Sequence, residues 1–168
     1  MKLRLLLLGI ALSPAAYADG GQSHSASTID YSQAEPTAFG VAADPRKATR
    51  TIRVEMRDTF RFIPENIIVR QDQVVRFIVE NKGKMPHEMV LGTMEELKEH
   101  AALMKKFPGM EHDEPSIAHV APGAHGEIGW RFSRAGTYYF ACLVPGHFEA
   151  GMIGTITVVP SPRKGSRP

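Results

Sequence analysis

Short segments in which apolar and polar residues alternate dominate the chain from Thr51 onwards. In the first of them, Ile52, Val54 and Met56 share one parity and charged residues occupy the other. Such alternation is typical of a half-buried β-strand. Segments of the same kind follow, separated by Gly, Pro and Asn, at 66–70, 74–81, 87–91, 127–132, 136–142 and 154–159. About seven short strands predict an all-β fold, an antiparallel sandwich or barrel.

One segment has a helical period instead. Thr93 and Glu96 have the spacing of a capping box, in which each side chain binds the backbone N–H of the other residue. Apolar residues then recur at helical spacing, and the sequence FPG at 107–109 ends the pattern. We expect one helical insertion over about 93–106, lying on the sandwich. Residues 110–125 are expected to be loop with room for one short edge strand.

The two ends of the chain differ in composition from the strand-rich part. Residues 1–18 combine two basic residues, an apolar run and a final Ala-Tyr-Ala, the pattern of a cleaved secretory signal peptide. Residues 19–50 are rich in Ser, Ala, Gly, Thr and Pro, and we expect a flexible segment there. Residues 161–168 are expected to form a disordered basic tail. The folded domain is therefore expected over 51–160.

Charge gives no support for a nucleic-acid partner. The predicted signal peptide carries two of the 20 basic residues, which leaves 18 against 18 acidic residues in the mature chain. No later stretch has the apolar length of a membrane span. We expect a periplasmic protein, although the leader alone is also compatible with the exterior of a Gram-positive cell. We also expect a monomer that is free of the membrane after signal cleavage.

The chain contains a single cysteine, Cys142, which cannot form an internal disulfide. In an exported protein an unpaired thiol is a liability unless it is buried or bound to a metal. Alternation places Cys142 on the same face as Tyr138 and Phe140, so its side chain should point into the core. A buried structural thiol is one interpretation. A cysteine–histidine nucleophile is disfavoured, because the thiol has the core parity and no third orienting group is apparent.

Three further residues could complete a metal site with this thiol. A Pro-Gly turn brings His147 back towards Cys142, and Met152 follows as the last strand begins. The best candidate for a fourth ligand is His87, which opens a strand that can neighbour the Cys142 strand. A thiolate, two imidazoles and a weak axial thioether suit copper in both oxidation states. Zinc more usually takes a tighter tetrahedral set of thiolates and imidazoles.

These residues lie in motifs that resemble a known family. The sequences NKGKMPH (81–87) and CLVPGHFEAGM (142–152) resemble the type 1 copper signature of the cupredoxins, the plastocyanin and azurin group. The upstream sequence FRFIPENIIVRQDQVVRFIVEN (60–81) resembles their first strands, and the likeness spans about 51–159. The resemblance implies a Greek-key cupredoxin sandwich with one type 1 copper. Its implied ligands are His87, Cys142, His147 and Met152.

The helical insertion and the ligand motifs look closest to exported cupredoxins linked to copper tolerance. This likeness implies a protein that binds copper ions and cycles them between Cu(I) and Cu(II), with no catalytic residues. A soluble one-electron carrier between periplasmic or respiratory redox enzymes is the alternative, and a cuprous oxidase is a third. One position departs from the pattern: plastocyanins and azurins have Asn after the first histidine, where it ties the ligand loops together, and this chain has Glu88.

Two further predictions concern the surroundings of the site. Histidines and methionines between 94 and 125 could form an accessory Cu(I) site, and the candidates are Met110, His112, His119 and His100. The alternative is that these are ordinary surface residues. The resemblance also implies an apolar surface for a transient redox partner around His147, built by Pro86, Leu143, Pro145 and Phe148. Some of these residues could instead pack beneath the ligand loop.

Overall fold

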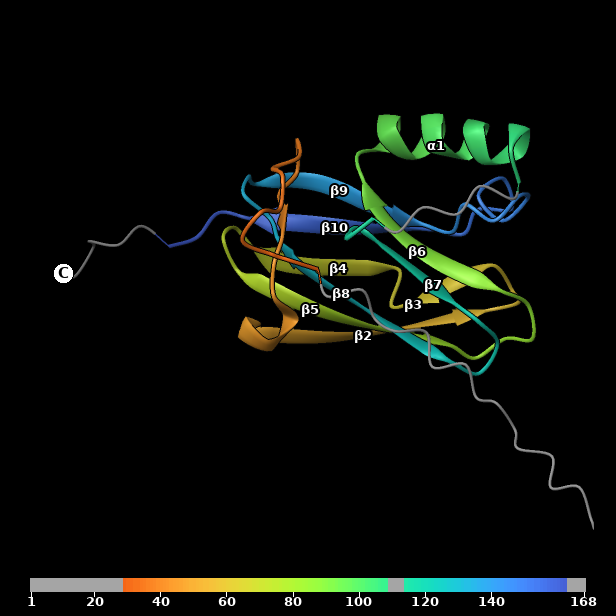
Figure 1. Ribbon diagram of the computed structural model, residues 1–168, viewed down its shortest axis with the longest axis horizontal. Helices are drawn as coiled ribbons and strands as arrows, with labels where there is room; N and C mark the ends of the chain where they lie inside the picture. The colour runs from red at the N-terminus through yellow and green to blue at the C-terminus, as the bar shows by residue number, and fades with distance from the viewer. Residues whose placement is uncertain (1–28, 109–113, 163–168) are drawn as a thin grey trace, which may run out of the picture.

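Two five-stranded β-sheets pack face to face, and one helix lies on the outside of the second sheet (Figure 1). This is a computed structural model that describes residues 29–108 and 114–162. The elements in chain order are β1 (Val41–Ala42), the short 3-10 helix η1 (Pro45–Lys47), β2 (Arg50–Arg57), β3 (Arg61–Ile63), β4 (Asn66–Arg70), β5 (Val74–Asn81), β6 (His87–Gly92), α1 (Met94–Lys106), β7 (Ile117–Val120), β8 (His125–Arg131), β9 (Gly136–Ala141) and β10 (Ile153–Val159). The predicted all-β sandwich with one helix is confirmed.

The sheets are mixed, which differs from the antiparallel arrangement that the alternation suggested. The first sheet has the order β1-β8-β5-β2-β3 and the second β4-β10-β9-β6-β7. Most neighbours are antiparallel, but β2 pairs parallel with β5, and β4 pairs parallel with β10. A parallel pair needs a crossover connection. Here β3 and β4, which belong to different sheets, supply the crossover between β2 and β5.

Alternating residues of both sheets fill the space between them. In β5 the side chains of Val75, Phe77 and Val79 are fully buried, and the intervening residues are partly exposed. Phe62 of β3 and Phe140 of β9 meet edge to face with ring centroids 4.8 Å apart, joining the two sheets. This apolar core holds the strand ends that carry the candidate ligands in fixed positions.

Helix α1 covers the outer face of the second sheet. Its N-terminus has the predicted capping box, with Thr93 as the N-cap and Glu96 closing it. Leu97, Ala101 and Met104 pack in one cluster with residues of β6 and β9. Strand β6 is therefore buried at all six positions, because the helix covers the face turned away from the core. The predicted helical insertion is confirmed.

The sequence suggested a flexible segment over residues 19–50. The last part of it, residues 39–50, is instead packed against the domain. Phe39 is 3% exposed and stacks on Trp130 with ring centroids 4.8 Å apart. Strand β1 pairs with β8, and Ala42 is buried. A two-residue strand and one aromatic ring leave too weak a period to be detected in a Ser-, Ala- and Pro-rich sequence.

Several predictions on the chain ends lie outside the described residues. They include the signal peptide at 1–18, the first part of the N-terminal segment and most of the tail at 161–168. Within the part of the chain that the structure describes, no helix is both long and apolar enough to span a bilayer.

Candidate metal centre

The candidate ligands meet at one end of the second sheet. Strands β6 and β9 are antiparallel neighbours, with Val90 opposite Ala141. The start of β6 therefore lies beside the end of β9, which places His87 next to Cys142. The loop from β9 to β10 supplies His147 and Met152. All four predicted ligands thus come from two adjacent strand ends and one loop.

Three ligand atoms converge on a single point. The Nδ1 atoms of His87 and His147 are 3.2 Å apart. The Sγ atom of Cys142 lies 3.2 Å from Nδ1 of His147 and 3.9 Å from Nδ1 of His87. Across residues 29–108 and 114–162, this trio is the one group of three or more His, Cys, Asp or Glu side chains close enough to share a metal ion. Two imidazoles and a thiolate suit copper.

Burial sets the protonation of these groups in the metal-free protein. Cys142 is fully buried, and burial raises the pKa of its thiol to about 12. Burial, with the neighbouring His87 second, lowers the pKa of His147. At neutral pH the site therefore holds a neutral thiol and a neutral His147 imidazole. Because a cation favours the thiolate, metal binding here releases a proton.

Backbone hydrogen bonds hold the ligand loop in a tight ring. The Cys142 N–H donates to the Met152 carbonyl at 3.1 Å, and the Met152 N–H donates to the His147 carbonyl at 3.0 Å. Gly146 and Gly151 have φ angles of 91° and 86°, in the left-handed region that favours glycine. Met152 is fully buried in the same apolar cluster as Cys142. The turn geometry thus brings Met152, the fourth predicted ligand, beside Cys142 and His147.

Asp58 orients His87 and was not identified from the sequence. Its Oδ1 lies 3.1 Å from Nε2 of His87, which leaves Nδ1 turned towards Cys142. The Asp58 carboxylate also accepts hydrogen bonds from the backbone N–H groups of Lys84, at 2.7 Å, and Met85, at 3.3 Å. The Lys84 N–H, and after it His87, lowers the pKa of Asp58 despite some opposing burial. Carboxylates that hold a ligating imidazole in this way fix its tautomer and ring orientation.

Asn81 fixes the segment that leads into His87. Its amide nitrogen donates to the carbonyls of Met85, at 2.8 Å, and Val120, at 2.9 Å. Its side-chain oxygen accepts from the Gly83 N–H at 2.8 Å. Asn81 is 1% exposed, so these hydrogen bonds satisfy a buried polar group and hold residues 82–86 in one conformation.

Glu88 joins the two ligand segments. Its backbone N–H donates to Cys142 Sγ at 3.5 Å, and its Oε1 accepts from the Leu143 N–H at 3.0 Å. Its Oε2 lies 2.9 Å from Nδ1 of His119, on β7. Glu88 is only 4% exposed, and each of its two carboxylate oxygens has a partner within the protein. At the position where the family pattern has Asn, the buried Glu88 carboxylate therefore connects the two ligand segments.

Of the predicted accessory residues, the structure describes His119 and His100, and neither joins a second cluster of metal-binding side chains among the described residues. His119 contacts Glu88, and His100 lies on helix α1. Met110 and His112 lie outside the described residues. The accessory Cu(I) site thus remains a prediction without support from the residues that are described.

The predicted apolar surface needs one correction. Leu143 is 1% exposed and packs beneath helix α1 with Leu97, because the alternation of β9 continues past Cys142 and turns it to the helix side. Pro86 and Pro145 are exposed, Phe148 is half-buried, and His147 is 7% exposed. Met85, which was not predicted, is 36% exposed beside Pro86.

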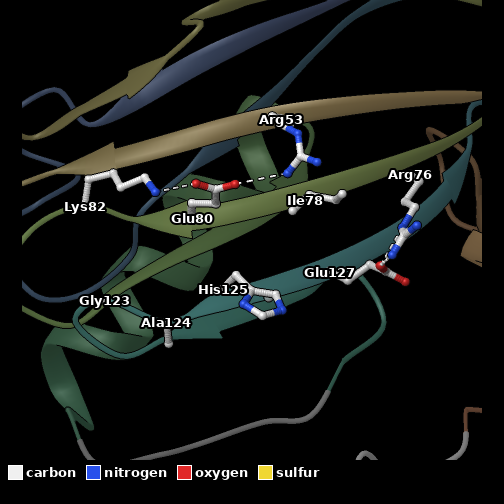
Figure 2. Close-up of a pocket in the computed structure, with 10 residues that line it drawn as sticks. Arg53, Arg76, Ile78, Glu80, Lys82, Gly123, Ala124, His125 and Glu127 are labelled. Carbon is white, nitrogen blue, oxygen red and sulfur yellow. Dashed lines mark hydrogen bonds and ion pairs between the residues drawn. The ribbon is translucent and has the colours of Figure 1, made fainter.

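A hollow of about 480 Å³ lies on the first sheet and contains none of the four predicted ligands. Figure 2 shows its charged side chains turned towards one another. Glu80 pairs with Arg53 at 3.1 Å and with Lys82 at 2.5 Å, and Arg76 pairs with Glu127. Each of these charged side chains is therefore paired within the hollow, and the three cations and two carboxylates leave a net charge of only one.

Comparison with known proteins places this centre in a family. The copper-resistant cuproprotein CopI of Rubrivivax gelatinosus is 46% identical over 155 residues, covering 92% of this chain and 94% of that protein. CopI of Pseudomonas aeruginosa is 33% identical over 158 residues, covering 77% and 87%.

Solved structures show the same fold. Auracyanin B has a TM-score of 0.59 at 24% identity, covering 74% of this chain and 97% of that one. Auracyanin from Roseiflexus castenholzii has a TM-score of 0.59 at 21% identity, covering 67% and 99%. Residues 48–159 match the family described as copper binding proteins, plastocyanin/azurin family. This chain therefore belongs to the plastocyanin/azurin family of copper-binding proteins.

Proposed function

We propose that this protein is an exported copper-tolerance cupredoxin that holds one type 1 copper ion. The ligands are His87, Cys142, His147 and Met152. The observation that carries the proposal is the convergence of two imidazole Nδ1 atoms and one thiol Sγ in a buried site. The copper-resistant cuproproteins that resemble the chain support the tolerance role. The proposed export to the periplasm is supported by the signal-peptide pattern at 1–18.

The chain's own residues prepare the site for a metal that changes oxidation state. Asp58 holds the ring of His87 so that Nδ1 faces Cys142. The Glu88 N–H donates to the Cys142 sulfur, and this donation stabilises the thiolate form. Bound copper supplies one-electron redox chemistry between Cu(I) and Cu(II). The apolar packing excludes water from the ligand atoms, so little reorganisation accompanies the change of charge.

A one-electron carrier is the second candidate function. It is favoured by the position of His147, which is nearly buried but lies in the same loop as the exposed Pro145. Met85 and Pro86, from the segment before His87, are exposed apolar residues as well. Small apolar patches of this kind suit weak, transient partners. In both candidate functions we propose that the protein binds copper and transfers electrons, and does not act as an enzyme.

Copper loading of the purified protein tests the ligand assignment. We expect one copper per chain and an intense visible band from thiolate-to-Cu(II) charge transfer. Cys142→Ser should abolish the band and His87→Ala should weaken copper binding, whereas His125→Ala, on the first sheet, should change neither. A wild-type protein without the band, or a Cys142→Ser variant that keeps it, contradicts the assignment.

Gene deletion separates the two functions. If tolerance is the role, the deletion strain should be more sensitive to copper, and the wild-type gene should restore growth where the Cys142→Ser gene does not. Unchanged copper sensitivity with reduced respiration would favour the electron carrier instead.

A further inference from the structure

We propose that Glu88 is a positioning residue that both ties the ligand segments together and supplies a fixed negative charge that lowers the reduction potential of the copper. This inference rests on the proposed ligand assignment. It extends that assignment by giving a role to the residue that departs from the family pattern, in which an uncharged Asn makes the tie.

The first part of the argument is geometric. Glu88 follows the ligand His87 directly, and its side chain reaches across to β9, where Oε1 accepts the Leu143 N–H at 3.0 Å. Leu143 in turn follows the ligand Cys142. One side chain therefore joins the residues next to two ligands, and the backbone N–H of Glu88 reaches Cys142 Sγ from the same position. An Asn side chain at this position could make the tie as well.

The second part concerns charge. The side chain of Glu88 is 6% exposed, and its oxygens accept from the Leu143 N–H and face His119 Nδ1. Two hydrogen-bonded oxygens are what a buried ionised carboxylate requires. Solvent screens such a charge weakly, so it acts on the nearby metal more strongly than a surface carboxylate would. An Asn at this position would carry no such charge.

The sign of the effect follows from the charge of the site. A thiolate, two neutral imidazoles and a thioether give a site of zero net charge with Cu(I) and of one positive charge with Cu(II). A carboxylate beside the thiolate attracts the Cu(II) site and has no net charge to attract in the Cu(I) site. It therefore stabilises the oxidised state, which lowers the reduction potential. His119 is 43% exposed at its side chain, so any charge on its ring is screened by water and offsets the carboxylate only in part.

The test uses two substitutions that separate the charge from the tie. Glu88→Gln keeps an oxygen for the Leu143 N–H and removes the charge, so the visible band should persist while the reduction potential shifts upward. Glu88→Ala removes both. In metal-free protein, hydrogen exchange at the Leu143 amide should be slow in wild type and Glu88→Gln, and clearly faster in Glu88→Ala. The matched control is Glu127→Gln on the first sheet (Figure 2), which should leave the potential and the Leu143 exchange rate unchanged.

Each result supports or overturns a stated part of the proposal. A Glu88→Gln protein with the wild-type potential overturns the charge role. Slow Leu143 exchange in Glu88→Ala overturns the tie. If Glu88→Gln does not fold, Glu88→Asn is measured instead, and its potential should also rise above wild type. Failure of the ligand assignment itself is distinguishable, because the wild-type protein would then lack the visible band before any substitution is made.

Discussion

The Asp58 carboxylate contacts Nε2 of His87, the ring nitrogen that points away from the site, with Oδ1 at 3.1 Å. The side chain of His87 is fully buried, while that of Asp58 is 34% exposed at the rim. The pair thus connects a buried ligand to the turn between β2 and β3, in the opposite sheet. The orientation of one ligand therefore depends on a segment that is almost 30 residues away in the chain.

Removing this carboxylate should weaken copper binding. Asp58→Ala frees the ring of His87 to rotate, so we expect copper affinity to fall by about 10- to 100-fold, as is typical for partners of a metal ligand. Asp58→Asn should be intermediate, because an amide oxygen can still accept from Nε2–H. Competition with a chelator of known affinity measures this. The matched control is Asp72→Asn, an exposed carboxylate that should leave affinity unchanged.

Copper affinity should rise with pH. In the metal-free protein the Cys142 thiol has a pKa of about 12, whereas the bound form is a thiolate, so binding releases one proton from this group. Affinity should then increase about tenfold per pH unit between about pH 7 and pH 9 from Cys142 alone. Burial lowers the pKa of His147, so that imidazole is already neutral there and adds no proton. Affinity that does not change over this range would contradict the raised pKa.

The packing of helix α1 should contribute strongly to stability. Leu97 is 1% exposed against the strands that carry His87 and Cys142, and Leu97→Ala should lower the free energy of unfolding by about 2–5 kcal/mol. Leu103, on the same helix, is 54% exposed. Leu103→Ala should therefore change stability by no more than about 0.5 kcal/mol. Urea denaturation of both metal-free variants checks the contrast, and equal losses would mean that the helix does not pack as described.

The segment that leads into β1 should also stabilise the domain. Phe39→Ala removes a ring that is 3% exposed and stacked on Trp130, so we expect a loss of about 3–5 kcal/mol. The comparison is Phe107→Ala, whose ring is 44% exposed at the end of α1 and should matter much less. Thermal unfolding of the two proteins would show this difference. Equal melting temperatures would support the flexible segment that the sequence suggested.

The alternating segments and the capping box were enough to predict the sandwich and the helix. Both patterns are local, because the side chains that determine them follow one another in the chain. The parity of the β9 segment also predicted that Cys142 is buried. The direction of strand pairing could not be predicted in the same way, because alternation looks the same in a parallel and an antiparallel partner of β2.

The trio of His87, Cys142 and His147 was predicted because its chemistry is visible in the residue types. The residues that support it were not predicted. Asp58 reaches His87 from another sheet, and a lone aspartate in a turn has no distinguishing pattern in the sequence. For Glu88, the sequence showed the departure from Asn but not the reach to Leu143, which depends on the pairing of β6 and β9.

Helix α1 and strand β6 have nearly the same length along their axes. Thirteen helical residues at about 1.5 Å each and six strand residues at about 3.3 Å each both advance the chain about 20 Å. Because the helix follows the strand and lies back over the sheet, it returns the chain to the level where β6 began (Figure 1). Lys105 accordingly pairs with Glu149 in the ligand loop at 2.5 Å. Because the two elements match in length, helix α1 ends beside the loop that carries His147 and Met152, and this ion pair fastens the helix end to that loop.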